Sequence, residues 1–330
     1  MSTTSKPTKP TSSFHLARRG VGVGLTSLRD YGIVASFIVI FVYLTFKSDV
    51  FLSKVNLFNV LDGNSSDGIM AVGGTLVLIA GGFDLSVGAI FALSGVIAAM
   101  LAPHMNPTYA IMIGALSGLG VGIVNGFITT VGRINAIVGT LATSIIISGV
   151  ALVLTDGLLI NVTTPGFTSL GQGTIFTLHY SVILWAVFAL VCGFLLWRTR
   201  FGRYIYASGG NAEAARLSGV RVNLIRGSTY AISGLSAGIA GVLVTSRVAT
   251  GDASTGTFPL AVIAGIVIGG TSILGGQGAV WRSVLGILLL AMIGNGFNLL
   301  GVNPIYQQIL QGSIILAAVA VDAWARKTSV

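Results

Sequence analysis

The segment at residues 109–131, YAIMIGALSGLGVGIVNGFITTV, decides the fold class of this 330-residue chain. It contains no charged side chain and is longer than the roughly 20 apolar residues that a helix needs to cross a bilayer. In lipid, a single apolar segment can satisfy its backbone N–H and C=O groups internally only as a helix. The segment is therefore predicted to be a transmembrane helix.

Apolar runs of similar length recur along the whole chain. Overall, 53% of the residues are hydrophobic and only 8% are charged, whereas a soluble domain has about 25% charged residues. We therefore predict an all-α, polytopic helical membrane protein with about ten transmembrane helices, in which the Gly-rich regions are candidates for broken or re-entrant helices. The other nine apolar regions lie at 31–46, 57–80, 84–101, 136–155, 181–197, 224–244, 259–274, 279–299 and 305–323.

Lysine and arginine are distributed unevenly between the two predicted membrane faces. With ten spans both chain ends lie on one side, and all but three of the 18 basic residues lie there too. The positive-inside rule assigns that side to the cytoplasm, so the formal charge of +9 reflects topology and not a nucleic-acid partner. We predict cytoplasmic tails at 1–30 and 326–330 and a membrane domain at 31–325. The three exceptions are Lys47, Lys54 and Arg247.

Signals for catalysis and for bound cofactors are missing from the sequence. Cys192 is the only cysteine, so neither an internal disulfide nor a multi-cysteine metal site can form. His15, His104 and His179 show no metal-binding spacing. The chain has no Gly-Lys dipeptide, which a phosphate-binding P-loop requires. The sequence therefore predicts a protein that is not an enzyme, binds no metal or cofactor, and does not hydrolyse ATP itself.

A polar insert at residues 198–226 separates two apolar runs. It carries six arginines and one acid, and it contains the stretch GGNAEAARLSGV at 209–220. Within this stretch Asn211 is a good N-cap, Glu213 lies in the first turn and Gly219 can end the helix, so we predict one short helix. An ordinary basic loop and a docking element for a cytoplasmic partner both fit the charges, and the capped helix favours docking. The candidate docking residues are Asn211, Glu213, Arg216, Leu217 and Gly219.

Polar side chains in or beside apolar spans form a second group of candidates. In GGFDLSVG at residues 81–88, a carboxylate between two spans is costly unless it caps a helix, pairs or faces water. Asp84 or Ser86 can cap the helix that begins there, or Asp84 can line a passage for a polar solute. Amides in spans allow the same two interpretations, since they pair between helices or line a passage. The candidate pathway residues are Asp84, Ser86, Asn125, Asn295 and Asn298.

Two patterns concern how the helices are arranged. Glycines inside the spans, such as Gly118, Gly234 and Gly238, indicate close helix packing in lipid. The tripeptide NGF occurs at both 125–127 and 295–297, which suggests internal repetition of the kind that is common in transporters.

Several motifs, in order along the chain, resemble those of one transporter family. They are GGFDLSVG at 81–88, GGNAEAARLSGV at 209–220, GGTS and GGQG within 269–278, and NLLGV at 298–302. Over about residues 30–325 the chain is similar to the ribose/xylose/arabinose/galactoside-type permeases of bacterial ABC sugar importers. The resemblance implies an inner-membrane permease subunit that works as a pair and translocates a ribose-like pentose, a hexose or a related polyol.

The resemblance also implies partners. A periplasmic sugar-binding protein would deliver the sugar, and we expect it to dock on the outward connections at 156–180 and 245–258. A separate cytoplasmic ATPase would use ATP and Mg²⁺, and the family's docking helix maps onto residues 211–219. The second permease copy and the lipid bilayer complete the expected partners, and no nucleic acid is implied.

One departure from the family pattern lies just before the GGTS motif. The family often has an acidic Glu-Leu-Asp segment there, whereas this chain reads TFPLAV at 257–262. The sugar, and the choice between a homodimer and a related heterodimer, therefore stay open. The alternative function is a stand-alone secondary transporter or channel for a small polar solute. Ion coupling requires ionisable groups in the membrane, and Asp62, Asp67 and Asp84 are the few candidates.

Overall fold

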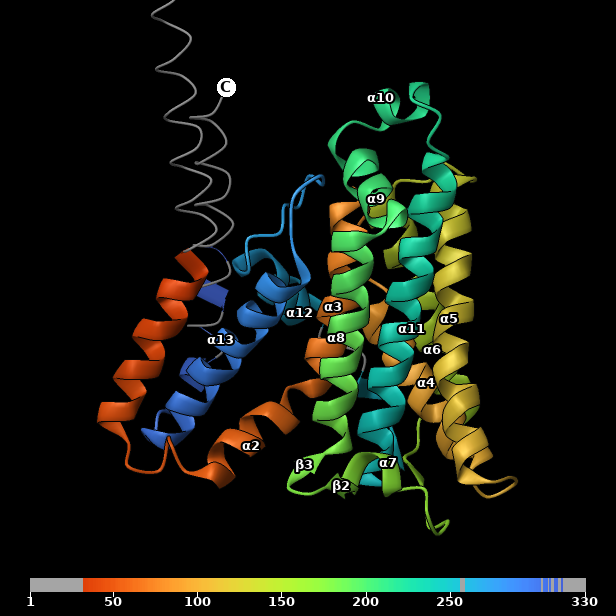
Figure 1. Ribbon diagram of the computed structural model, residues 1–330. Helices are drawn as coiled ribbons and strands as arrows, with labels where there is room; N and C mark the ends of the chain where they lie inside the picture. Colours follow the sequence, from red (N-terminus) through yellow and green to blue (C-terminus); the bar gives the residue numbers. More distant parts are fainter. Residues whose placement is uncertain are drawn as a thin grey trace, which may run out of the picture.

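A computed structural model confirms the all-α membrane class (Figure 1). The structure describes residues 32–255 and 259–303, together with 305–307, 309, 312, 313 and 316. Five of the described helices are long and apolar enough to cross a membrane: α5 (Pro107–Thr130), α6 (Ala136–Thr155), α8 (Tyr180–Arg198), α11 (Val222–Val248) and α13 (Val280–Leu299). Shorter apolar helices are Gly32–Lys47, α3 (Ser65–Ile79), α4 (Val87–Leu101) and α12 (Pro259–Ile268).

The predicted spans are observed as helices, with two corrections. The prediction of one helix over 57–80 is wrong, because the chain breaks at Asn64 into α2 (Lys54–Gly63) and α3. The Asn64 side chain donates a hydrogen bond to the carbonyl of Val60 in the last turn of α2. The helix ends there, and α3 begins in a new direction. The region 259–274 is helical only to Ile268. The last predicted span, 305–323, lies mostly outside the described residues.

Helix α11 forms the centre of the molecule. Its 27 residues correspond to about 40 Å, and it packs against α3, α4 and α5. The contact with α5 depends on glycine: a Cβ built on Gly118 would lie 2.4 Å from the carbonyl oxygen of Gly234, and one on Gly238 would lie 2.4 Å from that of Ala115. This confirms the predicted packing role of these glycines, because only small residues allow two helix backbones to come this close.

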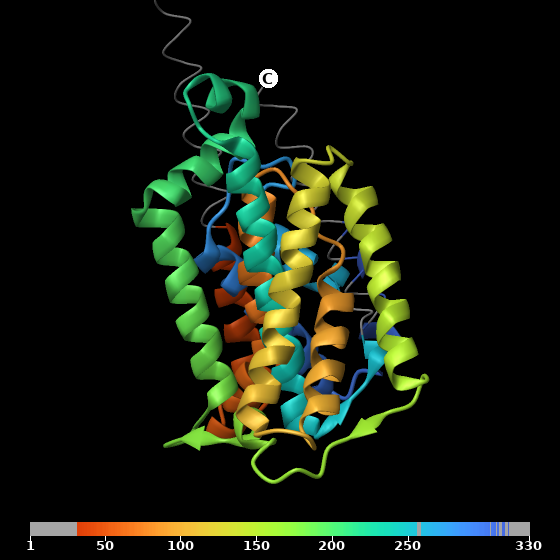
Figure 2. The ribbon, with the colours of Figure 1, turned by 90° about the vertical axis from the view of Figure 1, so that its right-hand side faces the viewer.

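The ends of α11 define two faces of the molecule. Its first turns lie beside the end of α5 and below α9 (Arg200–Gly210) and α10 (Ala212–Leu217), which project from the bundle (Figures 1 and 2). We call this end the α10 face. The last turn of α11 lies at the opposite face, where α2 crosses the molecule (Figure 1). Helix α9 was not predicted, since the basic insert was expected to contain one short helix.

The connection between α6 and α8 covers part of the opposite face. It contains β1 (Ile160–Asn161), α7 (Ser169–Gln172), β2 (Thr174–Ile175) and β3 (Leu178–His179). β2 pairs with β3, and β1 pairs with β4 (Thr250–Gly251), both antiparallel. Within this connection the Phe167 side chain is fully buried, and its carbonyl accepts from the Ser246 hydroxyl of α11 at 2.7 Å. The connection is therefore an ordered layer fixed to the end of α11.

The α5–α11 contact predicts a different effect for two neighbouring glycines. Gly118→Ala should lower the free energy of unfolding by about 1–3 kcal/mol, because the new methyl overlaps the backbone of α11. Gly120→Ala is the matched control, since a Cβ there meets no atom within 4 Å. Thermal unfolding of the purified variants in detergent measures the difference, and equal midpoints would contradict this packing.

Candidate functional site

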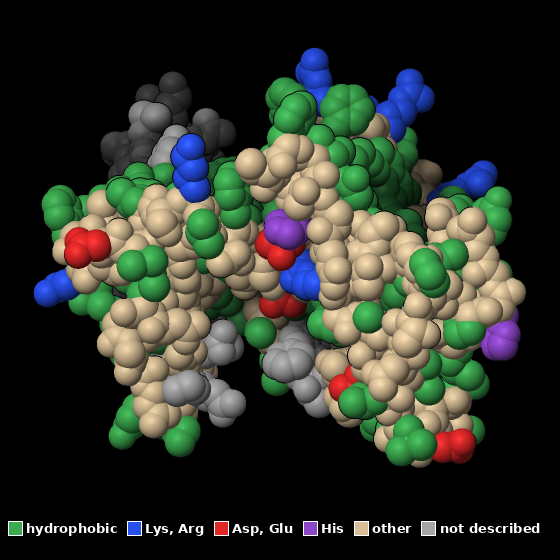
Figure 3. Space-filling view, turned by 90° about the horizontal axis from the view of Figure 1, so that it is seen from below, with side chains coloured by type: hydrophobic (Ala, Val, Ile, Leu, Met, Phe, Trp, Pro, Cys, Tyr) green, Lys and Arg blue, Asp and Glu red, His purple; other side chains and the backbone are tan. Residues whose placement is uncertain are grey.

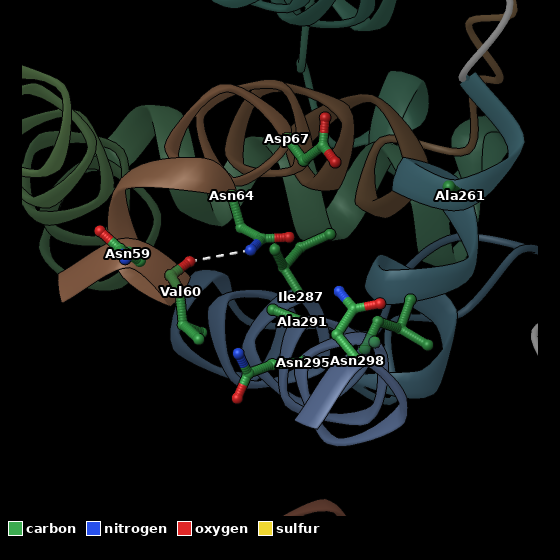
Figure 4. A pocket seen from close by; sticks show the side chains of 11 residues that line it. Asn59, Val60, Asn64, Asp67, Ala261, Ile287, Ala291, Asn295 and Asn298 are labelled. Atoms are coloured by element: carbon green, nitrogen blue, oxygen red, sulfur yellow. Dashed lines mark hydrogen bonds between the residues drawn. The ribbon is translucent and has the colours of Figure 1, made fainter. Parts of the chain in front are cut away.

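A cavity of ≈ 320 Å³ lies between the α2–α3 break and the helices α12 and α13 (Figure 4). Five of its lining side chains carry an amide or a carboxylate: Asn59, Asn64, Asp67, Asn295 and Asn298. Its other lining residues are Val60, Ala261, Ile287, Leu290, Ala291 and Gly294. Amides both donate and accept hydrogen bonds, and a few polar groups on an apolar wall are typical of sites for small solutes. The cavity can therefore hold a small, hydroxyl-rich molecule.

Paired amides fix the geometry of this cavity. The Asn56 Nδ2 donates to Asn295 Oδ1 at 3.1 Å, and the Asn295 Nδ2 donates to Asn56 Oδ1 at 2.8 Å, which joins α2 to α13. The Asn298 Oδ1 accepts from Gln307 at 2.9 Å. Asp67 makes no hydrogen bond or ion pair with the residues that the structure describes. Its carboxylate oxygens can thus accept hydrogen bonds from a bound solute.

An ion pair lies beside the cavity at the opposite face. Arg247, in the last turn of α11, contacts Asp62 of α2 with 3.0 Å between Nη2 and Oδ1, and the same nitrogen lies 3.3 Å from the Ser65 hydroxyl. Ser181, at the start of α8, donates to the same carboxylate. In Figure 3 acidic and basic side chains meet near the middle of this face, next to a hollow. The ion pair and its hydrogen bonds join α2, α3, α8 and α11 at this face.

Asp84, Ser86 and Asn125 form a separate, buried cluster. Asp84 Oδ1 accepts from the backbone N–H and the hydroxyl of Ser86, at 3.0 and 2.6 Å, and Oδ2 accepts from Ser233 of α11 at 2.8 Å. Asn125 of α5 donates to the Ser86 hydroxyl at 2.7 Å. The N-cap residue of α4 is Ser86, and its side chain makes no capping hydrogen bond. Asp84 is therefore not the N-cap, but it binds the residue that is. The cluster connects α4, α5 and α11.

The five candidate pathway residues therefore divide into two groups. Asn295 and Asn298 line the cavity, while Asp84, Ser86 and Asn125 lie among α4, α5 and α11 and do not line it. A role in solute passage stays a prediction for all five. Sequence reasoning did not single out Asn56, Asn59 and Asn64. A run of amides at the start of an apolar span was the signal that could have identified them.

The polar insert has the local structure that its sequence predicts. Asn211 accepts from the N–H of Ala214 at 3.0 Å, Glu213 and Arg216 pair at 3.0 Å, and Gly219 has φ +84°. Leu217 is 82% exposed at the end of α10. α10 thus presents one apolar side chain and one ion pair to its surroundings.

Helix α9 attaches this insert to two loops of the membrane domain, the loop between α3 and α4 and the loop between α12 and α13. Arg226 of α11 donates to the carbonyls of Ala80 and Ser208, at 2.9 and 2.8 Å, so it joins α9 to the loop between α3 and α4. Tyr206 of α9 donates to the carbonyl of Gly278, at 2.8 Å, in the loop between α12 and α13. Burial raises the pKa of Tyr206, so the phenol stays protonated and remains a donor. Sequence reasoning missed both attachments, because their partners are carbonyls far away in the chain.

The relatives of this chain are membrane permeases. A family model described as branched-chain amino acid transport system / permease component matches residues 56–319. The ribose import permease protein RbsC of Escherichia coli (strain K12) is 38% identical over 304 residues, which cover 89% of this chain and 94% of that protein. The L-arabinose transport system permease protein AraH of the same strain is 36% identical over 303 residues, covering 90% and 92%.

A relative from another bacterium is similar over nearly the same length. The ribose import permease protein RbsC of Bacillus subtilis (strain 168) is 35% identical over 288 residues, which cover 86% of this chain and 89% of that protein. No solved structure matches the chain significantly.

The Asp84 cluster predicts opposite outcomes for two substitutions. Asp84→Ala removes three accepted hydrogen bonds from buried groups and should lower the free energy of unfolding by at least about 1–3 kcal/mol. Asp84→Asn keeps an acceptor oxygen for Ser86, and its amide can donate to Ser233, so its thermal unfolding midpoint should stay near the native one. Solute uptake by the Asn variant then separates the two roles: normal uptake is expected for a structural carboxylate, and lost uptake at unchanged stability would place Asp84 in the pathway.

Proposed function

Because the matched region covers most of the chain, this protein belongs to the family of branched-chain amino acid transport system permease components, and we propose that it is the membrane-spanning permease subunit of an ABC importer for a monosaccharide. The named relatives import ribose and L-arabinose, which are both neutral pentoses. A neutral pentose suits a cavity whose polar groups are mostly amides, since each sugar hydroxyl both donates and accepts. The proposed substrate is therefore a sugar of this size.

The attachment of α9, which precedes the exposed α10, to the loops before α4 and α13 carries this proposal. Through Arg226 and Tyr206, a force on α10 reaches the loops that precede α4 and α13, and α13 forms one wall of the cavity. An importer driven by a separate ATPase needs such a connection. A stand-alone carrier does not require an exposed, capped helix that is attached to the loops before α4 and α13.

The partners follow from this placement. The cytoplasmic ATPase, which uses ATP and Mg²⁺, would bind α10 through Asn211, Glu213, Arg216, Leu217 and Gly219. A periplasmic sugar-binding protein would dock on the opposite face, on the ordered layer of residues 156–180 and on the described part of 245–258. A second permease copy would complete the transporter, with both chain ends in the bacterial cytoplasm. This orientation agrees with the six arginines near α10 and with the positive-inside rule.

The charges of α10 provide a test of the ATPase interface. Glu213→Arg combined with Arg216→Glu keeps the 3.0 Å pair but inverts its direction, and an exposed pair contributes at most about 1 kcal/mol to folding. Co-purification of the ATPase should fall about tenfold or more, while membrane insertion and the unfolding midpoint stay unchanged. The control is Phe176→Asp, a fully exposed apolar side chain on the opposite face. Undiminished assembly of the inverted pair would remove α10 from the interface.

A substitution at Asp67 distinguishes an ATP-driven importer from an ion-coupled carrier. Asp67→Asn keeps hydrogen bonding in the cavity and removes the charge, so ATP-driven uptake of a labelled pentose should stay within about threefold of the native rate. Vesicles with the ATPase, binding protein, ATP and Mg²⁺ provide the measurement, and vesicles without the ATPase are the control. Uptake that needs an ion gradient and no ATPase, and that is lost in Asp67→Asn, would instead identify a secondary transporter.

A further inference from the structure

We propose that the α10 face carries a binding site for the headgroup of an anionic phospholipid, between the end of α5 and the start of α11. The site goes beyond the proposed transport function and does not depend on it. It stands on a basic cavity, on two arginines that have no partner among the described residues, and on an apolar stripe that leads away from them.

The cavity has a volume of ≈ 940 Å³ and lies where α5, α10 and α11 meet. Four of its lining residues are arginines, and no described acidic residue lines it. The arginines are Arg133, Arg216, Arg221 and Arg226, and the other lining residues are Thr129, Thr130, Val220, Val222, Asn223 and Leu224. Figure 2 shows the elements that supply these residues: α10, the start of α11, and the end of α5 with the turn that follows it.

Two of these arginines have their charges engaged within the protein. Arg216 pairs with Glu213, and Arg226 donates to two backbone carbonyls. Arg133 and Arg221 are exposed and make no hydrogen bond or ion pair with the described residues. Two guanidinium groups that border one cavity repel each other unless an anion lies between them, and the guanidinium geometry matches phosphate oxygens.

The surroundings of the cavity indicate a lipid and not a soluble phosphate. Leu224, in the cavity wall, is 61% exposed. From the cavity, an apolar stripe follows the outer face of α5 towards the membrane centre, and the helical spacing of its members places them on one side of the helix. Its exposed members are Leu116, Ile123, Val124, Phe127 and Val131.

Gly120 lies on the same side of α5 and leaves the stripe open there, because a Cβ on it would meet no atom within 4 Å. An acyl chain can lie along the stripe while its phosphate reaches the arginines. Basic pockets between transmembrane helices on the cytoplasmic side bind anionic lipid headgroups in this way. An acidic segment of a soluble protein would satisfy the arginines but would leave the stripe unused.

Lipid retention during purification tests the site. The full-length protein is reconstituted with equal amounts of phosphatidylglycerol and phosphatidylcholine, extracted in mild detergent, and the lipid still bound is counted by native mass spectrometry. The native chain should retain phosphatidylglycerol in preference to phosphatidylcholine. Arg133→Gln with Arg221→Gln should retain about 25-fold less, since each arginine near an anionic surface contributes roughly a fivefold change.

Arg200→Gln with Arg203→Gln is the matched control, because both residues are exposed on α9 and do not line the cavity. Equal retention in the two double variants, or equal retention of the two lipids by the native chain, would overturn the site. Displacement of the lipid by millimolar glycerol 3-phosphate or inorganic phosphate would identify a soluble anion instead. If the Arg133/Arg221 variant does not fold, the native chain still decides: added NaCl should reduce retention of phosphatidylglycerol but not of phosphatidylcholine, and a lack of salt dependence would overturn the proposal.

Discussion

Non-helical backbone inside a membrane domain must find its hydrogen bonds within the protein, and this constraint organises the molecule. The loop between α3 and α4 is satisfied by side chains from other helices. Tyr230 of α11 bonds the N–H and the carbonyl of Phe83, and Thr140 of α6 accepts from the N–H of Leu85. In the loop between α12 and α13, the N–H of Gly276 donates to the carbonyl of Ile79. The loop between α3 and α4 is thereby joined to α6 and α11, and the loop between α12 and α13 is joined to the end of α3.

This requirement explains why α9 and α10 are firmly attached to a membrane domain from which they project. A Cβ on Gly209 would lie 1.8 Å from the carbonyl oxygen of Ile79, so α9 approaches the end of α3 as closely as backbone can. Arg226 donates to the carbonyl of Ala80 in the loop between α3 and α4, and Tyr206 donates to the carbonyl of Gly278 in the loop between α12 and α13. The same contacts join α9, which precedes α10, to the loop before α13, and α13 forms one wall of the cavity. The opposite face is held by different chemistry, the ion pair of Arg247 and Asp62.

The two NGF tripeptides occupy helices that run in opposite directions. In α5 the tripeptide lies towards the α10 face, where Gly126 contacts Gly227 at the start of α11. In α13 it lies towards the opposite face, where Asn295 pairs with Asn56 of α2. An inverted repeat would place the two tripeptides in this way, and internal repetition of the chain stays a prediction. The two asparagines nevertheless differ in use, since Asn125 belongs to the buried Asp84 cluster and Asn295 lines the cavity.

The sequence by itself determined the features that depend on local chemistry. Apolar length fixed the helical class, because lipid leaves a single segment no other way to bond its backbone. The cap at Asn211 and the close packing at Gly118 were equally predictable, since the first needs only residues within a turn and the second needs only the absence of a side chain. Only the tertiary structure decided which distant groups meet. Arg226 and Tyr206 donate to carbonyls, and Arg247 pairs with a carboxylate, that lie more than 15 residues away in the chain. The break at Asn64 depends on a change in helix direction. No local pattern in the sequence specifies these positions.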